Sequence, residues 1–215
     1  MLAAVRARIG GDVPLFAVGV SLGASALLNW LGRAGSEGAR IVTAAAGISA
    51  PLDLMASGRA IDAGLNRIYA LNFLHTLVPK ALAMDRRFPG LLDARRVARA
   101  RTMWTFDDAV TAPLHGFAGA DDYWTRASSK PWLRGIGLPT LVLNARNDPF
   151  IPGTSLPGPE DVSTAVTLEQ PDNGGHVGFL TPPLPGRLSW LAQRVTDYLS
   201  SASAMPIAGG MRIAS

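Results

Sequence analysis

A five-residue run, Gly19-Val-Ser-Leu-Gly23, limits what this chain can fold into more than any other feature. Residues 13–20, just before the serine, form a short apolar run typical of a strand buried on both faces, as strands of parallel sheets are. Residues 24–31 carry leucines at helical spacing. Glycine is expected at both flanks, because the serine takes unusual backbone angles and the strand approaches the helix closely. Ser21 is therefore predicted on a tight turn between a buried strand and a helix.

Three more strand patterns follow, at residues 40–46, 138–144 and 163–168. One helix separates the first two strands of the chain, and such a unit pairs its strands in parallel through a right-handed crossover. Helices are also expected near both ends of the chain, at residues 2–9 and 187–199. We therefore predict an α/β fold in which four parallel strands are flanked by helices.

The segment between the second and third predicted strands has no strand pattern. It contains helical stretches at residues 63–84 and 91–104, and we interpret it as a helical cap inserted between sheet strands. The last residues have no pattern of either kind, which is typical of a disordered tail. The predicted organisation is an interrupted α/β core of residues 1–52 and 134–200, a cap of residues 53–133, and a tail of residues 201–215.

The composition of the chain excludes several kinds of functional site. The 215 residues include no cysteine, which excludes disulfides, a thiolate nucleophile and cysteine-based zinc sites and agrees with the cytoplasmic location that we predict. No His, Asp and Glu cluster has metal-ligand spacing, and no glycine-rich nucleotide motif is present, so no cofactor is expected. The net charge is +4, and the basic residues are nearly all scattered arginines. The densest group, from Arg95 to Arg101, is interpreted as a solvated helix face and not as a nucleic-acid site.

Three polar residues stand just after predicted strands and could act together. Ser21 follows the first strand, Asp148 follows the third in a turn that contains Asp-Pro, and His176 follows the fourth between glycines. A serine hydroxyl becomes a nucleophile when a histidine takes its proton, and a carboxylate holds that histidine in the required tautomer. The order Ser, Asp, His at strand ends therefore predicts a catalytic triad.

Other titratable residues are alternatives with less support. Asp53 follows the second strand and is the rival candidate for the acid. Asp172 is interpreted as a cap of its own loop, and His75 as a packed residue of a helix. His115 has two interpretations that stay open, one as a pocket-lining residue and one as a structural residue.

The first apolar run also permits a different interpretation. Residues 13–32 contain no charged side chain, and Arg6 and Arg8 precede them. A charged start followed by about twenty apolar residues is typical of a membrane anchor or a signal. Pro14 and the turn-forming residues around Ser21 oppose this interpretation, so we predict no stable membrane insertion.

Several motifs together resemble the YheT-like branch of the α/β-hydrolases, which is related to carboxylesterases and acylglycerol lipases. The resemblance extends to about Ser200. It implies the α/β-hydrolase fold, a triad of Ser21, Asp148 and His176, and an oxyanion hole that uses the Leu22 backbone N–H as one of two donors. The motifs are Gly19–Gly23, Phe106–Asp108 with Thr111–Phe117, Asp122–Trp124, Asn147–Phe150 and Gly174–Phe179.

The resemblance also implies that the front of the fold is missing here. Relatives carry several further strands before this point, with a His-Gly loop that supplies the second oxyanion donor. Without those strands, the first strand of this chain is expected to be an exposed apolar edge. Because loss of one oxyanion donor costs about a hundred- to a thousandfold in rate, low turnover is expected of the chain as it stands.

The sequence as a whole predicts a serine hydrolase that acts on carboxylic esters, namely short- to medium-chain acyl esters or acylglycerols. Its expected partner is a small-molecule ester, and no nucleic-acid partner is expected. The alternatives are an inactive hydrolase-fold fragment or a binding protein and, with less support, a membrane-anchored protein.

Overall fold

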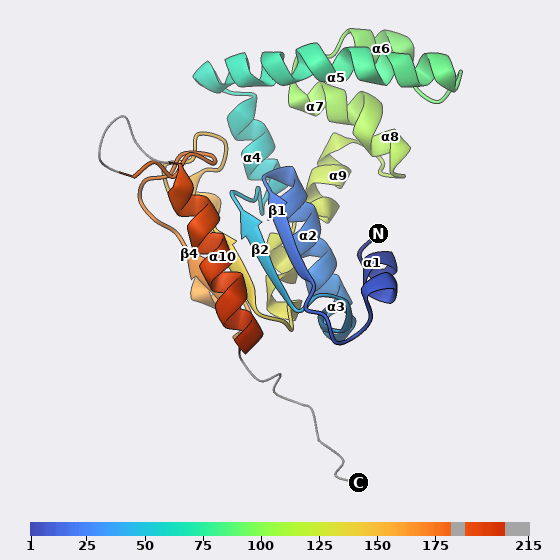
Figure 1. Cartoon of the computed structure of the whole chain (residues 1–215). Helices are drawn as coiled ribbons and strands as arrows, with labels where there is room; N and C mark the ends of the chain where they lie inside the picture. Colours follow the sequence, from blue (N-terminus) through green and yellow to red (C-terminus); the bar gives the residue numbers. More distant parts are fainter. Residues whose placement is uncertain (182–187, 205–215) are drawn as a thin grey trace.

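Four short apolar segments pair into one parallel sheet, as the sequence predicts (Figure 1). The computed structural model describes residues 1–181 and 188–204. The α/β fold with four parallel strands flanked by helices is confirmed. Neighbouring strands are all parallel and lie in chain order: β1 (Phe16–Val20), β2 (Ala44–Ile48), β3 (Thr140–Leu143) and β4 (Val166–Glu169).

The second strand begins later than predicted. Gly35, with a positive φ of 52°, precedes a short helix, α3 (Ser36–Ile41). The prediction of a strand at residues 40–46 is therefore wrong at its start. Ile41 is apolar because it packs against the core from this helix. The strand also ends at Ile48, two residues beyond its predicted end.

β1 lies at the edge of the sheet, and one of its faces is open. Ala17 is buried, whereas Val18 and Val20 are 51% and 48% exposed. Successive side chains of a strand point to opposite faces, so these two valines share the uncovered face. The expected apolar edge is confirmed in the described part of the chain, and the expectation that both faces of this strand are buried is wrong.

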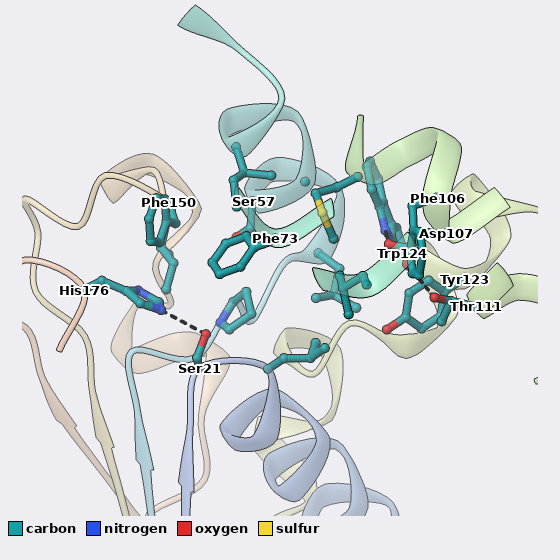
Figure 2. Close-up of a pocket in the computed structure, with 18 residues that line it drawn as sticks. Ser21, Ser57, Phe73, Phe106, Asp107, Thr111, Tyr123, Trp124, Phe150 and His176 are labelled. Carbon is teal, nitrogen blue, oxygen red and sulfur yellow. Dashed lines mark hydrogen bonds between the residues drawn. The ribbon is translucent and has the colours of Figure 1, made fainter. Parts of the chain in front are cut away.

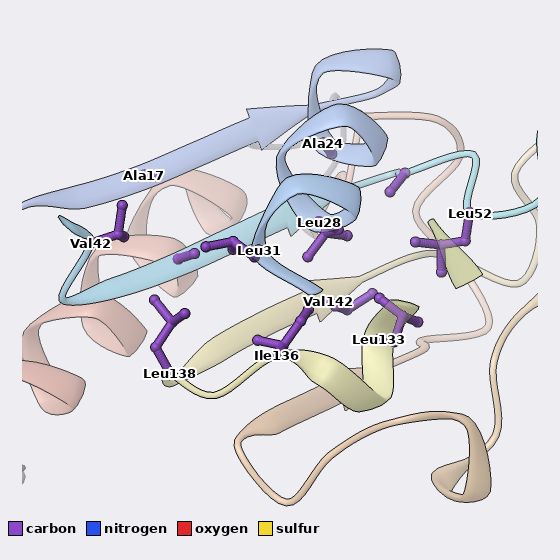
Figure 3. Close-up of a cluster of buried hydrophobic side chains, with 12 residues drawn as sticks. Ala17, Ala24, Leu28, Leu31, Val42, Leu52, Leu133, Ile136, Leu138 and Val142 are labelled. Carbon is purple, nitrogen blue, oxygen red and sulfur yellow. The ribbon is translucent and has the colours of Figure 1, made fainter. Parts of the chain in front are cut away.

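Helices cover the two faces of the rest of the sheet. α2 (Leu22–Ala34) packs its leucines on one face, together with the segment that leads into β3 (Figure 3). α10 (Ser189–Ala204) packs on the other face, over β2 and β3, and it reaches β1 only at Phe16, which leaves Val18 and Val20 open on that side. Ala45 belongs to the first apolar cluster and its neighbour Ala46 to the second, as the alternation of a strand requires.

The segment between β2 and β3 is helical, as predicted, and has an apolar cluster of its own. The expected continuous helix at residues 91–104 is wrong, because Asp93 and Thr102 each cap the start of a separate helix. The boundaries given for a cap and a core stay a prediction. The helices are α4 (Leu54–Ile61), α5 (Arg67–Arg87), α6 (Ala94–Ala98), α7 (Met103–Phe106), α8 (Ala112–Leu114) and α9 (Ala120–Ala127).

The two ends of the described chain are helical. α1 (Leu2–Ile9) lies where the sequence predicts it, and the Arg6 guanidinium ties it to the core by donating to the carbonyl of Ile41 at 2.9 Å. α10 continues to Ala204, so the structure differs from the prediction of a disordered tail for residues 201–204. Its last turns pack on the sheet, which extends the helix. The remaining tail residues, 205–215, lie outside the described residues.

The apolar run of residues 13–32 does not form one helix. It is divided between β1 and α2, and Ser21 lies between these elements. Across residues 1–181 and 188–204, no helix is long and apolar enough to cross a membrane.

Candidate active site

Ser21 lies on the turn that joins β1 to α2. Its φ of 53° and ψ of −128° lie outside the regions that residues other than glycine favour. Gly19 permits the close packing of strand and helix, because a Cβ there would lie 2.6 Å from the Cα of Ala24. A Cβ at Gly23 would meet no atom of the described residues within 4 Å. The expectation that the turn needs glycine on both sides is therefore wrong for Gly23.

The structure brings the three predicted site residues together. The Nε2 atom of His176 lies 2.9 Å from the Oγ of Ser21 (Figure 2), and its Nδ1 atom lies 2.8 Å from the Oδ2 of Asp148. The Asp148 side chain is fully buried, and its Oδ1 accepts the backbone N–H of Phe150 at 2.8 Å. The imidazole is thus held between a hydroxyl and a carboxylate, in an arrangement that can move a proton away from Ser21.

A neighbouring side chain fixes the loop that carries His176. The Oδ1 of Asn147 accepts the backbone N–H groups of Gly174 at 3.0 Å and of Gly175 at 2.9 Å. Two neighbouring residues of one turn therefore position His176: Asn147 holds its loop, and Asp148 holds its imidazole ring. This role of Asn147 was not predicted from the sequence. The available signal was its place in a strand-end turn, where Asn side chains often accept backbone hydrogen bonds.

An aromatic contact links the site to the helical segment. The ring of Phe150 meets the imidazole of His176 edge to face, with centroids 4.8 Å apart. Tyr69 and Phe73 of α5 contact the same phenylalanine, with centroids at 5.0 Å and 6.4 Å. The position of α5 is thus coupled to the imidazole through Phe150, a residue for which the sequence predicts no separate role.

The alternative residues do not join this group. Asp53 caps α4 by accepting a backbone N–H of that helix, so it serves the helix and not His176. Asp172, His75 and His115 are exposed, and the expectation that His75 is packed is wrong. Among the side chains that the structure describes, no group of three or more His, Cys, Asp or Glu residues could hold a metal ion.

Ser21 and His176 lie at one end of a cavity of about 380 Å³ between the sheet and the helical segment (Figure 2). Leu22 lines the cavity next to Ser21. It is the first residue of α2, so its backbone N–H has no acceptor within the helix and can serve a ligand. The wall is mainly apolar and consists of Ser21, Leu22, Pro51, Leu54, Ser57, Gly58, Ile61, Phe73, Leu77, Met103, Phe106, Asp107, Thr111, Tyr123, Trp124, Phe150, Ile151 and His176.

Comparison with known proteins assigns the family. Residues 1–183 match the family described as the alpha/beta hydrolase fold. The chain belongs to the α/β-hydrolase family. The expected resemblance to the YheT-like branch is confirmed, because this α/β-hydrolase is 35% identical over 193 residues to the YheT protein of Escherichia coli (strain K12). That match covers 89% of this chain and 56% of the YheT protein.

Further relatives carry lipase names. The chain is 32% identical over 196 residues to human phospholipase ABHD3, with 88% of this chain and 46% of that protein covered. It is 30% identical over 192 residues to the monoacylglycerol lipase of Saccharomyces cerevisiae, with 86% and 42% covered. This α/β-hydrolase chain therefore spans about half the length of these relatives. A crystal structure of Paleococcus ferrophilus monoacylglycerol lipase shares the fold, with a TM-score of 0.51, 16% identity, and 93% of this chain and 72% of that chain covered.

The cavity of this α/β-hydrolase has a polar group at the end away from Ser21 (Figure 2). Asp107 begins a π-helical turn, Asp107–Thr111, and accepts hydrogen bonds from Thr111 and Trp124. Burial raises the pKa of the Asp107 carboxyl, although the two hydrogen bonds oppose the rise. Burial and the charge of Asp107 raise the pKa of Tyr123 to about 12. From the sequence, Asp107 is only part of a family-like motif, and its place in the cavity was not predicted.

Proposed function

We propose that this chain is a serine hydrolase that cleaves carboxylic esters. The observation that carries the proposal is the pair of hydrogen bonds that links Ser21 to His176 and His176 to Asp148 at the end of a mainly apolar cavity. The names of two relatives, a phospholipase and a monoacylglycerol lipase, agree with ester cleavage. A cytoplasmic location stays a prediction from composition.

In the proposed reaction, the Oγ of Ser21 attacks the ester carbonyl carbon while the Nε2 of His176 takes the hydroxyl proton. Asp148 accepts the Nδ1–H, which fixes the tautomer and stabilises the imidazolium. The oxyanion is expected to accept a hydrogen bond from the Leu22 N–H. His176 then gives its proton to the departing alcohol. In the second half, water gives a proton to His176, attacks the acyl-enzyme and releases the acid, and the proton returns to Ser21.

The cavity supports an acyl chain as the group bound beside Ser21. Its wall includes Leu54, Leu77 and Phe106, which offer apolar surface and fix no polar substituent. Burial of an alkyl chain contributes about 0.8 kcal/mol for each CH₂ group. We therefore propose short- to medium-chain acyl esters or acylglycerols as the substrate class.

The test follows covalent labelling of Ser21 and ester hydrolysis in parallel. A fluorophosphonate probe is expected to label the wild-type chain on Ser21, as mapped by mass spectrometry, and Ser21→Ala is expected to abolish both labelling and hydrolysis of aryl esters. Labelling needs a single turnover, so it detects the nucleophile even where turnover is slow. Asp148→Asn is expected to lower the rate by up to about 10⁴-fold, because the imidazole then adopts the wrong tautomer.

Asp53→Ala is the matched control for the acid. It removes a helix cap and is expected to cost about 1 kcal/mol of stability with little change in labelling rate. A wild-type chain that folds, binds esters and is not labelled on Ser21 would instead favour the binding protein.

A further inference from the structure

The first half of α5, with the turn Gly64–Asn66 before it, exposes large apolar side chains to solvent. The opposite side of the helix is buried, where Leu74 and Ala81 pack in the apolar cluster of the helical segment. Contiguous exposed apolar residues on a protein surface mark an interaction site. Five side chains, each between 40% and 84% exposed, form what we call the apolar patch: Leu65, Ile68, Tyr69, Leu71 and Phe73.

The apolar patch continues into the cavity that contains Ser21. Phe73 belongs to both, because its ring is 40% exposed and also lines the cavity (Figure 2). The ring of Tyr69 contacts that of Phe150 with centroids 5.0 Å apart, and Phe150 in turn contacts the imidazole of His176. The patch is therefore an outward continuation of the apolar cavity wall.

The surface around the apolar patch is strongly basic. Residues 64–101 contain eight basic side chains and two acidic ones. Both acids accept backbone N–H groups: Asp85 accepts that of Leu92 at 3.0 Å, and Asp93 caps the start of α6. Six of the basic side chains are exposed and form no ion pair with any side chain that the structure describes, namely Arg67, Lys80, Arg86, Arg87, Arg95 and Arg99.

The apolar and basic groups lie at the same end of the molecule. Figure 1 shows α5 and α6 packed side by side there, beyond α4 and α7 and away from the sheet. We call this end, residues 64–101, the cap surface. It combines exposed apolar side chains with an excess of six positive charges, which is the difference between its eight basic and two acidic residues.

We propose that the cap surface docks on a membrane that contains anionic lipids, with α5 lying in the plane of the lipid headgroups. A helix in this position buries its apolar side chains at the boundary between headgroups and acyl chains, while its basic side chains attract anionic headgroups. Docking on the surface needs no helix that crosses the bilayer, and no described helix could cross it. Lipid binding requires no ester cleavage, so this inference goes beyond the proposed function.

Two other occupants fit the cap surface less well. A second copy of the chain would bring two positively charged surfaces together, and like charges across an interface oppose binding. A nucleic acid would neutralise the basic side chains, but its bases stack on aromatic rings. It would leave the aliphatic side chains of Leu65, Ile68 and Leu71 exposed to water. An anionic lipid surface satisfies both the charge and the aliphatic groups.

The test measures flotation of the purified chain with lipid vesicles through a density gradient, in which aggregated protein stays at the bottom. The wild-type chain is expected to float with vesicles of equal parts phosphatidylcholine and phosphatidylglycerol, and far less with phosphatidylcholine alone. High salt is expected to weaken the binding, because it screens exposed charges. The assay contains no ester substrate, so a failure of the proposed catalytic function would leave its result unaffected.

Two double variants remove the two kinds of contact separately. Arg86→Gln with Arg87→Gln is expected to weaken binding to the anionic vesicles by about 10- to 30-fold, because each basic residue near such a surface contributes about fivefold. Leu65→Ser with Ile68→Ser is expected to weaken it by at least about tenfold, because these side chains no longer enter the membrane. Both leucine and isoleucine are mainly exposed, so their loss is expected to change the stability of the fold little.

Each double variant has a matched control away from the cap surface. Arg8→Gln with Arg40→Gln lowers the net charge equally, on α1 and α3 near the other end of the molecule (Figure 1). Val13→Ser with Val18→Ser removes two apolar side chains that are about half exposed, beside and within β1. Both controls are expected to bind the anionic vesicles nearly as tightly as the wild type does.

A fluorescent label reports which residue enters the membrane. The chain contains no cysteine, so Ile68→Cys and Val18→Cys each create one site for an environment-sensitive nitrobenzoxadiazole label. On anionic vesicles, the emission of the label at position 68 is expected to rise and to shift to shorter wavelength, because the label leaves water. The label at position 18 is expected to show no change.

Three results would overturn the proposal. The first is a wild-type chain that does not float with anionic vesicles. The second is flotation that neither double variant of the cap surface weakens, or that leaves the label at position 68 unchanged. The third is a dimer in sedimentation velocity that Leu65→Ser with Ile68→Ser dissociates, which would assign the apolar patch to a second copy of the chain.

Discussion

Asn147 and Gly175 are joined by a hydrogen bond of 2.9 Å that ties the turn of Asp148 to the loop of His176. The same Oδ1 atom also accepts the N–H of Gly174 at 3.0 Å. Both glycines immediately precede His176 in the chain, so the side-chain amide of Asn147 fixes the position of the imidazole ring. Asn147 therefore acts as a positioning residue for the proposed reaction.

Asn147→Ala is expected to lower the rate of Ser21 labelling by about 10- to 100-fold, because a small displacement of a reacting group has effects of this size. Asn147→Asp keeps an oxygen acceptor and is expected to restore most of the rate. Hydrogen exchange at the Gly174 and Gly175 amides gives a readout that is independent of catalysis. Their protection should fall in Asn147→Ala and persist in Asn147→Asp. Unchanged protection in the alanine variant would contradict this role.

The two glycines around Ser21 are expected to respond differently to alanine. Gly19→Ala places a Cβ 2.6 Å from the Cα of Ala24, so strand and helix must separate, at a cost of about 3 kcal/mol in unfolding free energy. In Gly23→Ala the added Cβ contacts no neighbouring atom, and alanine is the better helix former at this position in α2. This substitution is expected to raise the free energy of unfolding by up to about 1 kcal/mol. Denaturant unfolding of both variants measures the contrast. Similar effects of the two substitutions would show that the close approach at Gly19 is not what limits the turn.

Ser21→Gly is expected to unfold at a higher temperature than Ser21→Ala. Both variants remove the hydroxyl, but only glycine relieves the strain of a residue held at a φ of 53°. We expect a difference of about 1 kcal/mol, since the greater freedom of glycine in the unfolded chain offsets part of the gain. Calorimetry of the two variants side by side gives the comparison. A more stable alanine variant would mean that the turn is not strained.

Asp107 gives the unfolding free energy a defined pH dependence. Burial raises the pKa of its carboxyl above 3.8 in the folded chain, so the folded state holds the proton to higher pH than the unfolded state does. The resulting stability is fully present below pH 3.8 and is lost as the pH rises through the folded pKa. The free energy of unfolding of the wild type relative to Asp107→Asn should therefore fall as the pH rises from 3.8 through the folded pKa.

Asp107→Asn is a fair reference because the Thr111 hydroxyl can accept as well as donate, which lets the amide keep both hydrogen bonds. Urea unfolding at several pH values measures the two curves. If the unfolding free energies of the two proteins change in parallel with pH, burial does not raise the pKa of the Asp107 carboxyl.

Local patterns predicted much of the sheet and the candidate site. Strand and helix periods depend on neighbouring residues, so β1, α2 and the later strands were found, with errors mainly at their ends. Ser21, Asp148 and His176 could be grouped because each follows a strand, and parallel strands present their carboxyl ends along one edge of a sheet. Their catalytic roles stay a proposal.

Tertiary structure decided the features that depend on which elements meet. Val18 and Val20 are exposed because α10 packs elsewhere on the sheet, and the sequence of β1 alone does not predict the position of that helix. The hydrogen bond from Gly175 to Asn147 and the hydrogen bond from the Trp124 indole to Asp107 join residues that are distant in the sequence, and no local pattern predicts either bond. Periodicity and turn chemistry are local properties, whereas the contacts that hold the imidazole and shape the cavity form only when the sheet and the helical segment pack together.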